Sequence, residues 1–269
     1  MPESISINSI IMMGVTAAIL FFLPVIVTIV WKKKMGEKVS WKSLLIGAVG
    51  FFVTVRVLEL GVHMVCLVLD TPISRFINGN TVAFVLYGIF MAGIFEECGR
   101  YIIIKYIVKK NKTTENMIMY GIGHGGMEVW AISLLTVISN LAMAIMLNTL
   151  GVEAFMKATA VTAENQATAT TMMNQIGTFG FANGAVMVME RVFCMVIHIC
   201  LTLVVFYGIK ENKKIYLPLA ILAHATFDLF PALYQRGIGT MWMTELWLAF
   251  CGILLVLWCI KLFDFCLIC

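Results

Sequence analysis

The stretch FMAGIFEECGRYIIIKYIVKK, residues 90–110, decides the fold because an apolar run long enough to cross a bilayer contains Glu96, Glu97 and Arg100. A spanning helix needs about 20 mostly apolar residues. A charge near the bilayer centre costs about 2.5–3.5 kcal/mol on insertion scales, so such residues usually face the inside of a bundle and mark a functional site. The stretch therefore predicts a membrane-spanning helix that carries functional polar groups.

The composition of the whole chain agrees with this interpretation. Of 269 residues, 61% are hydrophobic and 13% are charged, and the mean hydropathy is +0.96. Soluble domains are only about half apolar. Apolar runs recur along nearly the whole length, which predicts a single integral membrane domain over residues 1–269, surrounded by lipid and without a nucleic-acid partner.

Hydropathy predicts an all-α, polytopic bundle of seven transmembrane helices. The expected spans lie near residues 8–31, 43–69, 82–108, 116–147, 182–209, 215–235 and 239–262, with a catalytic core over 82–235. The connections after the first, third and fifth spans are rich in lysine, which predicts that they are cytoplasmic. The N-terminus is then outside, the C-terminus is cytoplasmic, and the protein is a multi-pass protein of the cell membrane.

Three further features favour structural interpretations. The segment 152–175 is expected to be a loosely held surface helix or loop on the outer face. Arg56, Glu59 and His63 share one helix face and are expected to dock that helix. Glu190 and Arg191 are expected to be an interfacial ion pair or a snorkelling pair. The eight cysteines are expected to pack as small hydrophobic residues; they are at positions 66, 98, 194, 200, 251, 259, 266 and 269.

Ionisable residues on four predicted helices lie at similar depths. Counted from the lysine-rich ends at 1.5 Å per residue, Glu97, Glu128, His198 and His224 are about 15–18 Å deep. Three pairs with i,i+4 spacing also share a helix face. These pairs are Glu96 with Arg100, His124 with Glu128, and His224 with Asp228. The layer predicts one inward-facing polar site.

Histidines and carboxylates that converge in a dry layer can bind a metal cation, and zinc takes such ligands readily. A remaining carboxylate could then act as a general base. A metal-free site is the alternative, in which a carboxylate activates water and a histidine or arginine stabilises the oxyanion. The adjacent acids Glu96 and Glu97 are expected to act as a coupled pair that holds a water molecule.

The residues resemble the YhfC-type intramembrane proteases, within a wider group that includes the CPBP (CAAX protease and bacteriocin-processing) and PrsW-type enzymes. The resemblance covers the third to sixth spans. It is carried by four motifs in order: EECGR, GIGHGGME, the helix that contains His198, and HATFD. The chain departs from the CPBP pattern in two places. The first motif is one residue shorter before its arginine, and in the second motif Glu128 stands where a histidine is usual. PrsW-like members also have an acid at the second of these positions.

This resemblance implies an intramembrane endopeptidase that acts on peptide or membrane-protein substrates. Glu96 and Glu97 would activate water, and Arg100 would orient the pair. His198 and His224 would bind the metal or stabilise the oxyanion, Asp228 would support His224, and the second motif would contribute His124 and Glu128. The implied ligand set for zinc is Glu128, His198 and His224.

Two other classes of function use intramembrane acids and histidines. An ion-coupled transporter is one, although the spans show no inverted repeat and no pair of helices broken by glycine or proline. A non-catalytic scaffold or peptide-binding subunit is the other. Retention of both acids and both histidines favours the enzyme.

Overall fold

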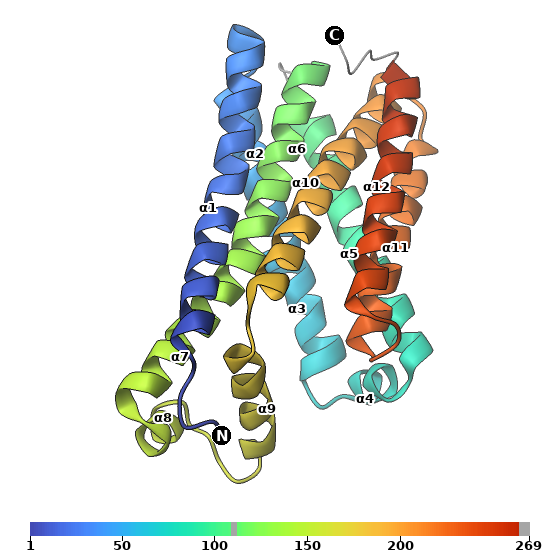
Figure 1. Ribbon diagram of the computed structural model, residues 1–269. Helices are drawn as coiled ribbons and strands as arrows, with labels where there is room; N and C mark the ends of the chain where they lie inside the picture. Colours follow the sequence, from blue (N-terminus) through green and yellow to red (C-terminus); the bar gives the residue numbers. More distant parts are fainter. Residues whose placement is uncertain (109–111, 264–269) are drawn as a thin grey trace. The chain divides into compact units, whose positions relative to one another are not determined.

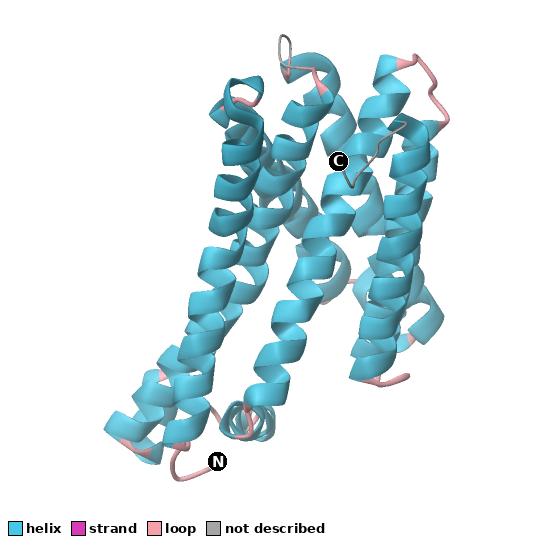
Figure 2. Cartoon of the chain, turned by 45° about the horizontal axis from the view of Figure 1, so that its top comes forward, coloured by secondary structure: helices cyan, strands magenta, loops and turns pink. Residues whose placement is uncertain are grey.

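The computed structural model describes residues 1–108 and 112–263, and every regular element in those residues is a helix (Figure 2). Seven helical segments are long and apolar enough to cross a membrane, which confirms the predicted all-α multi-pass architecture. They are Ile7–Lys38, Trp41–Val68, Thr81–Ile107, Thr114–Leu150, Phe181–Lys210, Tyr216–Gln235 and Met241–Phe263. Lys109 and Lys110 of one predicted cytoplasmic loop, and Cys266 and Cys269, lie outside the described residues.

Several spans consist of an α-helix that continues into a π-helical stretch. The α-helices are α1 (Ile7–Met35), α2 (Trp41–Phe51), α3 (Leu60–His63), α4 (Pro72–Gly79), α5 (Thr81–Ile102), α6 (Thr114–Glu128), α7 (Leu135–Leu150), α8 (Val152–Ala158), α9 (Gln166–Gly177), α10 (Phe181–Lys210), α11 (Tyr216–Gln235) and α12 (Met241–Phe263) (Figure 1). The π-helical stretches are η2 (Phe52–Glu59), η3 (Met64–Val68), η4 (Ile103–Ile107) and η5 (Val129–Leu134), and η1 (Gly36–Lys38) is a short 3-10 turn.

Side chains at the helix starts explain several of these boundaries. The Ser40 hydroxyl accepts a hydrogen bond from the backbone N–H of Lys42 at the start of α2. Asn80 caps α5 in the same way through the N–H of Ala83. Such caps satisfy backbone N–H groups that have no partner within the helix. The sequence therefore sets where these spans begin, independently of hydropathy.

The chain divides into two compact units. One contains residues 1–23 and 129–191, and the other contains residues 24–128 and 192–269. In the first unit the predicted loose segment forms α8 and α9, whose side chains Phe155, Met173 and Ile176 are buried. Asn148 exchanges two hydrogen bonds with the backbone of Ile5 and ties the N-terminal segment to the end of α7. Residues 152–175 thus form mainly exposed helices, as expected of a surface helix or loop, with Phe155 and Met173 as their buried side chains.

In the second unit α2 packs on α6, and α11 packs on both α5 and α12 (Figures 1 and 2). Glycines permit the closest approach. A Cβ atom at Gly123 would lie 2.0 Å from the carbonyl oxygen of Leu44, and one at Gly47 would lie 2.1 Å from that of Tyr120. Both obstacles are backbone atoms, which cannot rotate away. The glycines of GIGHGGME therefore allow α2 and α6 to pack backbone against backbone.

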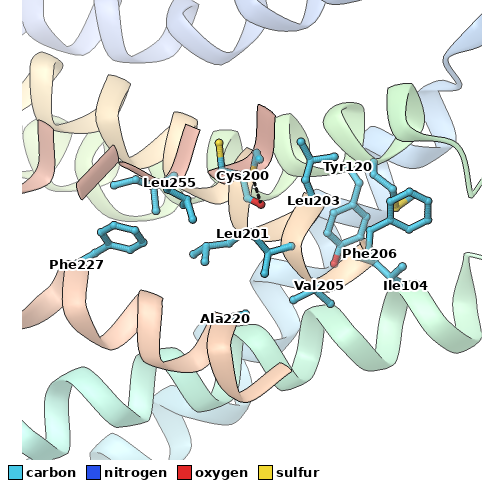
Figure 3. Packing of buried hydrophobic residues seen from close by; sticks show 14 of the residues in the cluster. Ile104, Tyr120, Cys200, Leu201, Leu203, Val205, Phe206, Ala220, Phe227 and Leu255 are labelled. Carbon is cyan, nitrogen blue, oxygen red and sulfur yellow. Dashed lines mark hydrogen bonds between the residues drawn. The ribbon is translucent and has the colours of Figure 1, made fainter. Parts of the chain in front are cut away.

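A hydrophobic core lies beside this helix pair in the second unit (Figure 3). Its centre is the α10 segment that contains Leu201, Val204 and Val205, all nearly inaccessible. The Sγ of Cys259 on α12 donates to the carbonyl oxygen of Cys200 at 3.4 Å. Cys200, Cys251 and Cys259 are buried free cysteines in this core, as expected for small hydrophobic residues.

The polar stripe of the second span docks it against α5. Glu59 lies 3.2 Å from Nε2 of His63, and Nδ1 of the same ring lies 2.7 Å from the hydroxyl of Tyr87. Tyr87 belongs to α5, so the stripe joins two neighbouring spans. In the other unit, Glu190 and Arg191 form the expected ion pair.

Candidate active site

All eight residues singled out from the sequence lie in the second unit, where three short sequence segments and one isolated histidine supply them. Four side chains join one buried network through direct contacts with Glu96 or Glu97, and Glu128 and Asp228 join it through a histidine. The eight are Glu96, Glu97, Arg100, His124, Glu128, His198, His224 and Asp228. Tight helix packing positions them, since Gly125 of α6 would meet the backbone of Met195 on α10 if it carried a Cβ.

Glu97 and Arg100 form the most buried pair of the network. Nη1 of Arg100 donates to Oε1 and Oε2 of Glu97 at 2.5 and 2.6 Å. Nδ1 of His224 lies 2.8 Å from Oε1 of the same carboxylate. The exposed fractions of the Glu97 and Arg100 side chains are both 0%. Both oxygens of Glu97 are thus engaged by fixed donors.

Glu96 has a different set of neighbours, although it is adjacent in sequence. Its Oε2 lies 2.9 Å from Nε2 of His124 and 3.5 Å from Nδ1 of His198. Its Oε1 lies 3.9 Å from Nε2 of His224. The two acids were expected to act as a coupled pair around one water. Their shortest contacts go to different side chains, because consecutive residues of a helix point about 100° apart, although Arg100 and His224 lie within 4 Å of both carboxylates.

Each histidine has a distinct environment. Nε2 of His198 lies 2.5 Å from Oε2 of Glu128, so this carboxylate orients the ring while Nδ1 faces Glu96. His224 lies between two carboxylates, since its Nε2 is 3.3 Å from Oδ2 of Asp228. Only an imidazolium donates from both nitrogens. His224 is therefore suited to donate hydrogen bonds, with Asp228 as its support.

The environment of His124 was not anticipated from the sequence. Phe51 meets its ring edge to face at a centroid distance of 5.1 Å, and Tyr120 stacks on it at 6.3 Å. These aromatic rings enclose the imidazole, and Nδ1 has no hydrogen-bond partner. The position of Tyr120 one helical turn before His124 is the sequence signal for this contact. The aromatic walls fix the ring with Nε2 directed at Glu96.

Within the described residues, one histidine and carboxylate group meets the geometry of a metal site. Ligand atoms of Glu96, His124 and His198 all lie within 4.8 Å of one another. Donors around a tetrahedral zinc with bonds of about 2.0–2.1 Å would lie roughly 3.3 Å apart, and the 2.9 and 3.5 Å separations here bracket that value. The donor set therefore fits a metal ion.

This group differs from the ligand set that the sequence favoured. Of Glu128, His198 and His224, only His198 belongs to it. Glu128 contacts the other nitrogen of His198, and His224 is held by Glu97 and Asp228. Ligating histidines usually direct their second nitrogen at a carboxylate. If a metal ion were bound by this group, Glu128 would be such a supporting partner, and His124 would stand where the sequence placed His224.

The charge balance of the layer also favours a cation. With neutral imidazoles, four carboxylates and one guanidinium give a formal charge of −3; these are Glu96, Glu97, Glu128, Asp228 and Arg100. Buried negative charge is costly unless it is paired. A divalent ion and a proton on His224 would together offset it.

Comparisons with known proteins identify the family of this chain. A family model for the YhfC intramembrane metalloprotease matches residues 19–248. The chain belongs to the YhfC intramembrane metalloprotease family. The uncharacterized membrane protein YhfC of Bacillus subtilis (strain 168) is 31% identical over 234 residues, which cover 87% of this chain and 88% of that protein. No solved structure matches the chain.

The region matched to the YhfC family includes every residue of the buried network. An apolar groove of about 660 Å³ lies near this network, between α2 with η2 and α5 with η4. Phe95, Cys98 and Gly99 line the groove, whereas Glu96 and Glu97 face the network. The groove therefore lies on the opposite flank of α5 and does not open onto the carboxylates.

Proposed function

We propose that this protein is an intramembrane endopeptidase that hydrolyses peptide bonds of membrane or membrane-proximal substrates, with Glu96 as its central acid. The observation that carries the proposal is the position of Glu96 between His124 and His198, next to a glutamate whose oxygens are already engaged. Membership of a family described as intramembrane metalloproteases supports the same chemistry.

Glu96, His124 and His198 would hold the ion, and Glu128 would orient His198. Zinc is the proposed metal, because it accepts this set of nitrogen and oxygen donors. Bound there, such an ion would supply Lewis acidity, which would polarise a carbonyl oxygen and make a bound water more acidic.

The proposed roles of the other residues follow from their contacts. Oε1 of Glu96 faces His224 at 3.9 Å rather than a close donor, so it is the oxygen that accepts a proton from the attacking water. Glu97 holds Arg100 and His224 in place. Nε2 of His224 lies 3.3 Å from Asp228, so its proton would turn from Asp228 to the developing oxyanion or to the leaving amine, while Glu97 holds Nδ1 and the Asp228 carboxylate stabilises the charged ring.

The least buried member of the network indicates the direction of substrate approach. The Asp228 side chain is 33% exposed, whereas those of Glu96 and His224 are 8% and 6% exposed. Asp228 is one helical turn beyond His224 on α11, away from the lysine-rich end. We infer that the peptide reaches His224 and Glu96 from this side.

The test compares E96Q with wild type on a membrane-anchored reporter peptide in proteoliposomes. E96Q should lose cleavage by about 10²-fold or more, the scale of general acid–base catalysis, while it keeps the wild-type thermal unfolding transition. The control is N183Q, at the start of α10 in the other unit, which should cleave normally. Wild-type cleavage by E96Q would refute the proposal, and absence of cleavage by wild type across a library of membrane peptides would favour a scaffold.

A further inference from the structure

Arg100 occupies a position in the candidate metal group that a bound cation would also use. Its Nη2 lies 2.9 Å from Nε2 of His124, 3.0 Å from Nδ1 of His198 and 3.7 Å from Oε2 of Glu96. These three atoms come from the three residues that could hold a metal. The guanidinium thus supplies the positive charge at the centre of the group.

The other half of the guanidinium is anchored elsewhere. Nη1 donates to both oxygens of Glu97, and the arginine side chain is fully buried. Arg100 therefore has two separable functions, a fixed ion pair through Nη1 and a contact with the metal group through Nη2.

The hydrogen bonds from Nη2 and the coordination of a metal ion would use the same lone pairs on the histidine nitrogens. An imidazole nitrogen that accepts a hydrogen bond from Arg100 uses its lone pair, which is the pair that it would donate to a metal. The guanidinium keeps its charge in proteins, so a divalent ion within the group would also repel it strongly at low dielectric constant. Both effects oppose simultaneous occupation.

We propose that Arg100 competes with the metal for His124 and His198 and thereby sets the affinity of the site. In the metal-free protein Nη2 neutralises the group. Metal entry requires Nη2 to turn away while Nη1 stays on Glu97. This inference rests on the proposed function for the role of the group as a metal site, but it concerns binding and not hydrolysis.

Lysine at position 100 separates the two functions. R100K keeps a positive charge for Glu97, but an ammonium lacks the fork that reaches Glu97 and both histidines together. The affinity for Zn²⁺ should therefore rise by about 10–100-fold, the usual scale on which partners of metal ligands act. The matched control is R236K, because Arg236 binds the backbone of Ile77 and Asn78 and takes no part in the network.

The experiment measures Zn²⁺ affinity of the full-length protein in detergent by competition with a chromophoric chelator. Tighter binding of one ion by R100K, with R236K like wild type and loss of binding in an H124A/H198A double variant, supports the proposal. Equal or weaker binding by folded R100K overturns it. Cleavage assays are independent, so this failure would leave the proposed function standing.

A second measurement needs no substitution. The chain has five arginines, which selective ¹⁵N labelling makes visible by NMR of their side chains. One Zn²⁺ per chain should shift the Nη signals of one arginine in the wild-type protein, the signature of a guanidinium that leaves its acceptors. Unchanged arginine signals at full zinc occupancy would overturn the competition.

Discussion

Replacement of Gly123 by alanine should disturb the site through backbone packing, without touching any charged group. A Cβ at this position would lie 2.0 Å from the carbonyl oxygen of Leu44, whereas ordinary contacts begin at 3.4 Å. The α2 and α6 backbones must therefore separate by about 1.4 Å along this direction. Neither helix can avoid this movement by rotating a side chain.

The expected cost has two parts. Overpacking of this kind costs about 1–3 kcal/mol and sometimes more, and alanine recovers about 1 kcal/mol of helix propensity relative to glycine. His124 is the next residue, and its Nε2 lies 2.9 Å from both Glu96 and Arg100. A displacement of about 1.4 Å would lengthen these 2.9 Å contacts beyond hydrogen-bonding distance, so His124 would lose one or both partners. Each loss costs about 1–3 kcal/mol for a buried polar group.

G123A should therefore unfold at a lower temperature in detergent and bind Zn²⁺ at least about tenfold more weakly, because His124 is itself a proposed ligand and is displaced from Glu96 and His198. The control is G88A on α5, where a Cβ would meet no atom within 4 Å; it should be neutral or stabilising by up to about 1 kcal/mol. If G123A kept both the wild-type melting temperature and the wild-type zinc affinity, the close-packing argument would be refuted.

Three further predictions follow from individual contacts. E97Q should be less stable than E96Q by about 3–5 kcal/mol, because it leaves Arg100 without its buried partner; equal melting temperatures of the two variants in detergent would contradict this. E128Q should weaken zinc binding about 10–100-fold through His198, measured by chelator competition, and an unchanged affinity would exclude a supporting role. Y87F should lower the free energy of unfolding by about 1 kcal/mol, since it removes the hydrogen bond to His63; identical denaturation of the variant and wild type would show that this contact does not dock the second span.

Much of the architecture was predictable because hydropathy and side-chain periodicity are local properties. The seven spans were found from apolar runs alone, and α5 was placed within two residues at its N-terminus. The depth count also grouped Glu97, Glu128, His198 and His224, because the rise of a helix converts sequence distance into depth. The composition of 152–175 also indicated a surface helix or loop, but not that Phe155 and Met173 would be buried, since their burial depends on tertiary packing.

The partner choices within the layer were not predictable in this way. The sequence indicated that Glu96 and Glu97 share a depth and that three histidines lie near them. It could not indicate that the shortest contacts of Glu97 are with Arg100 and His224. Nor could it indicate that those of Glu96 are with His124 and His198. Sequence distance gives the height of a residue in the bundle, but the direction in which each side chain points depends on the rotation of every helix.

The sequence by itself thus determined a seven-span helical membrane protein with one buried layer of acids and histidines, because apolar length and helical rise are fixed by local chemistry. Only the tertiary structure decided that His124 joins Glu96 and His198 in the candidate metal group, and that Arg100 lies among them. The physical reason is that α6 approaches α10 at Gly125 and α5 approaches its neighbours at Gly93 and Gly99, and these approaches set the helix rotations that bring the three side chains together.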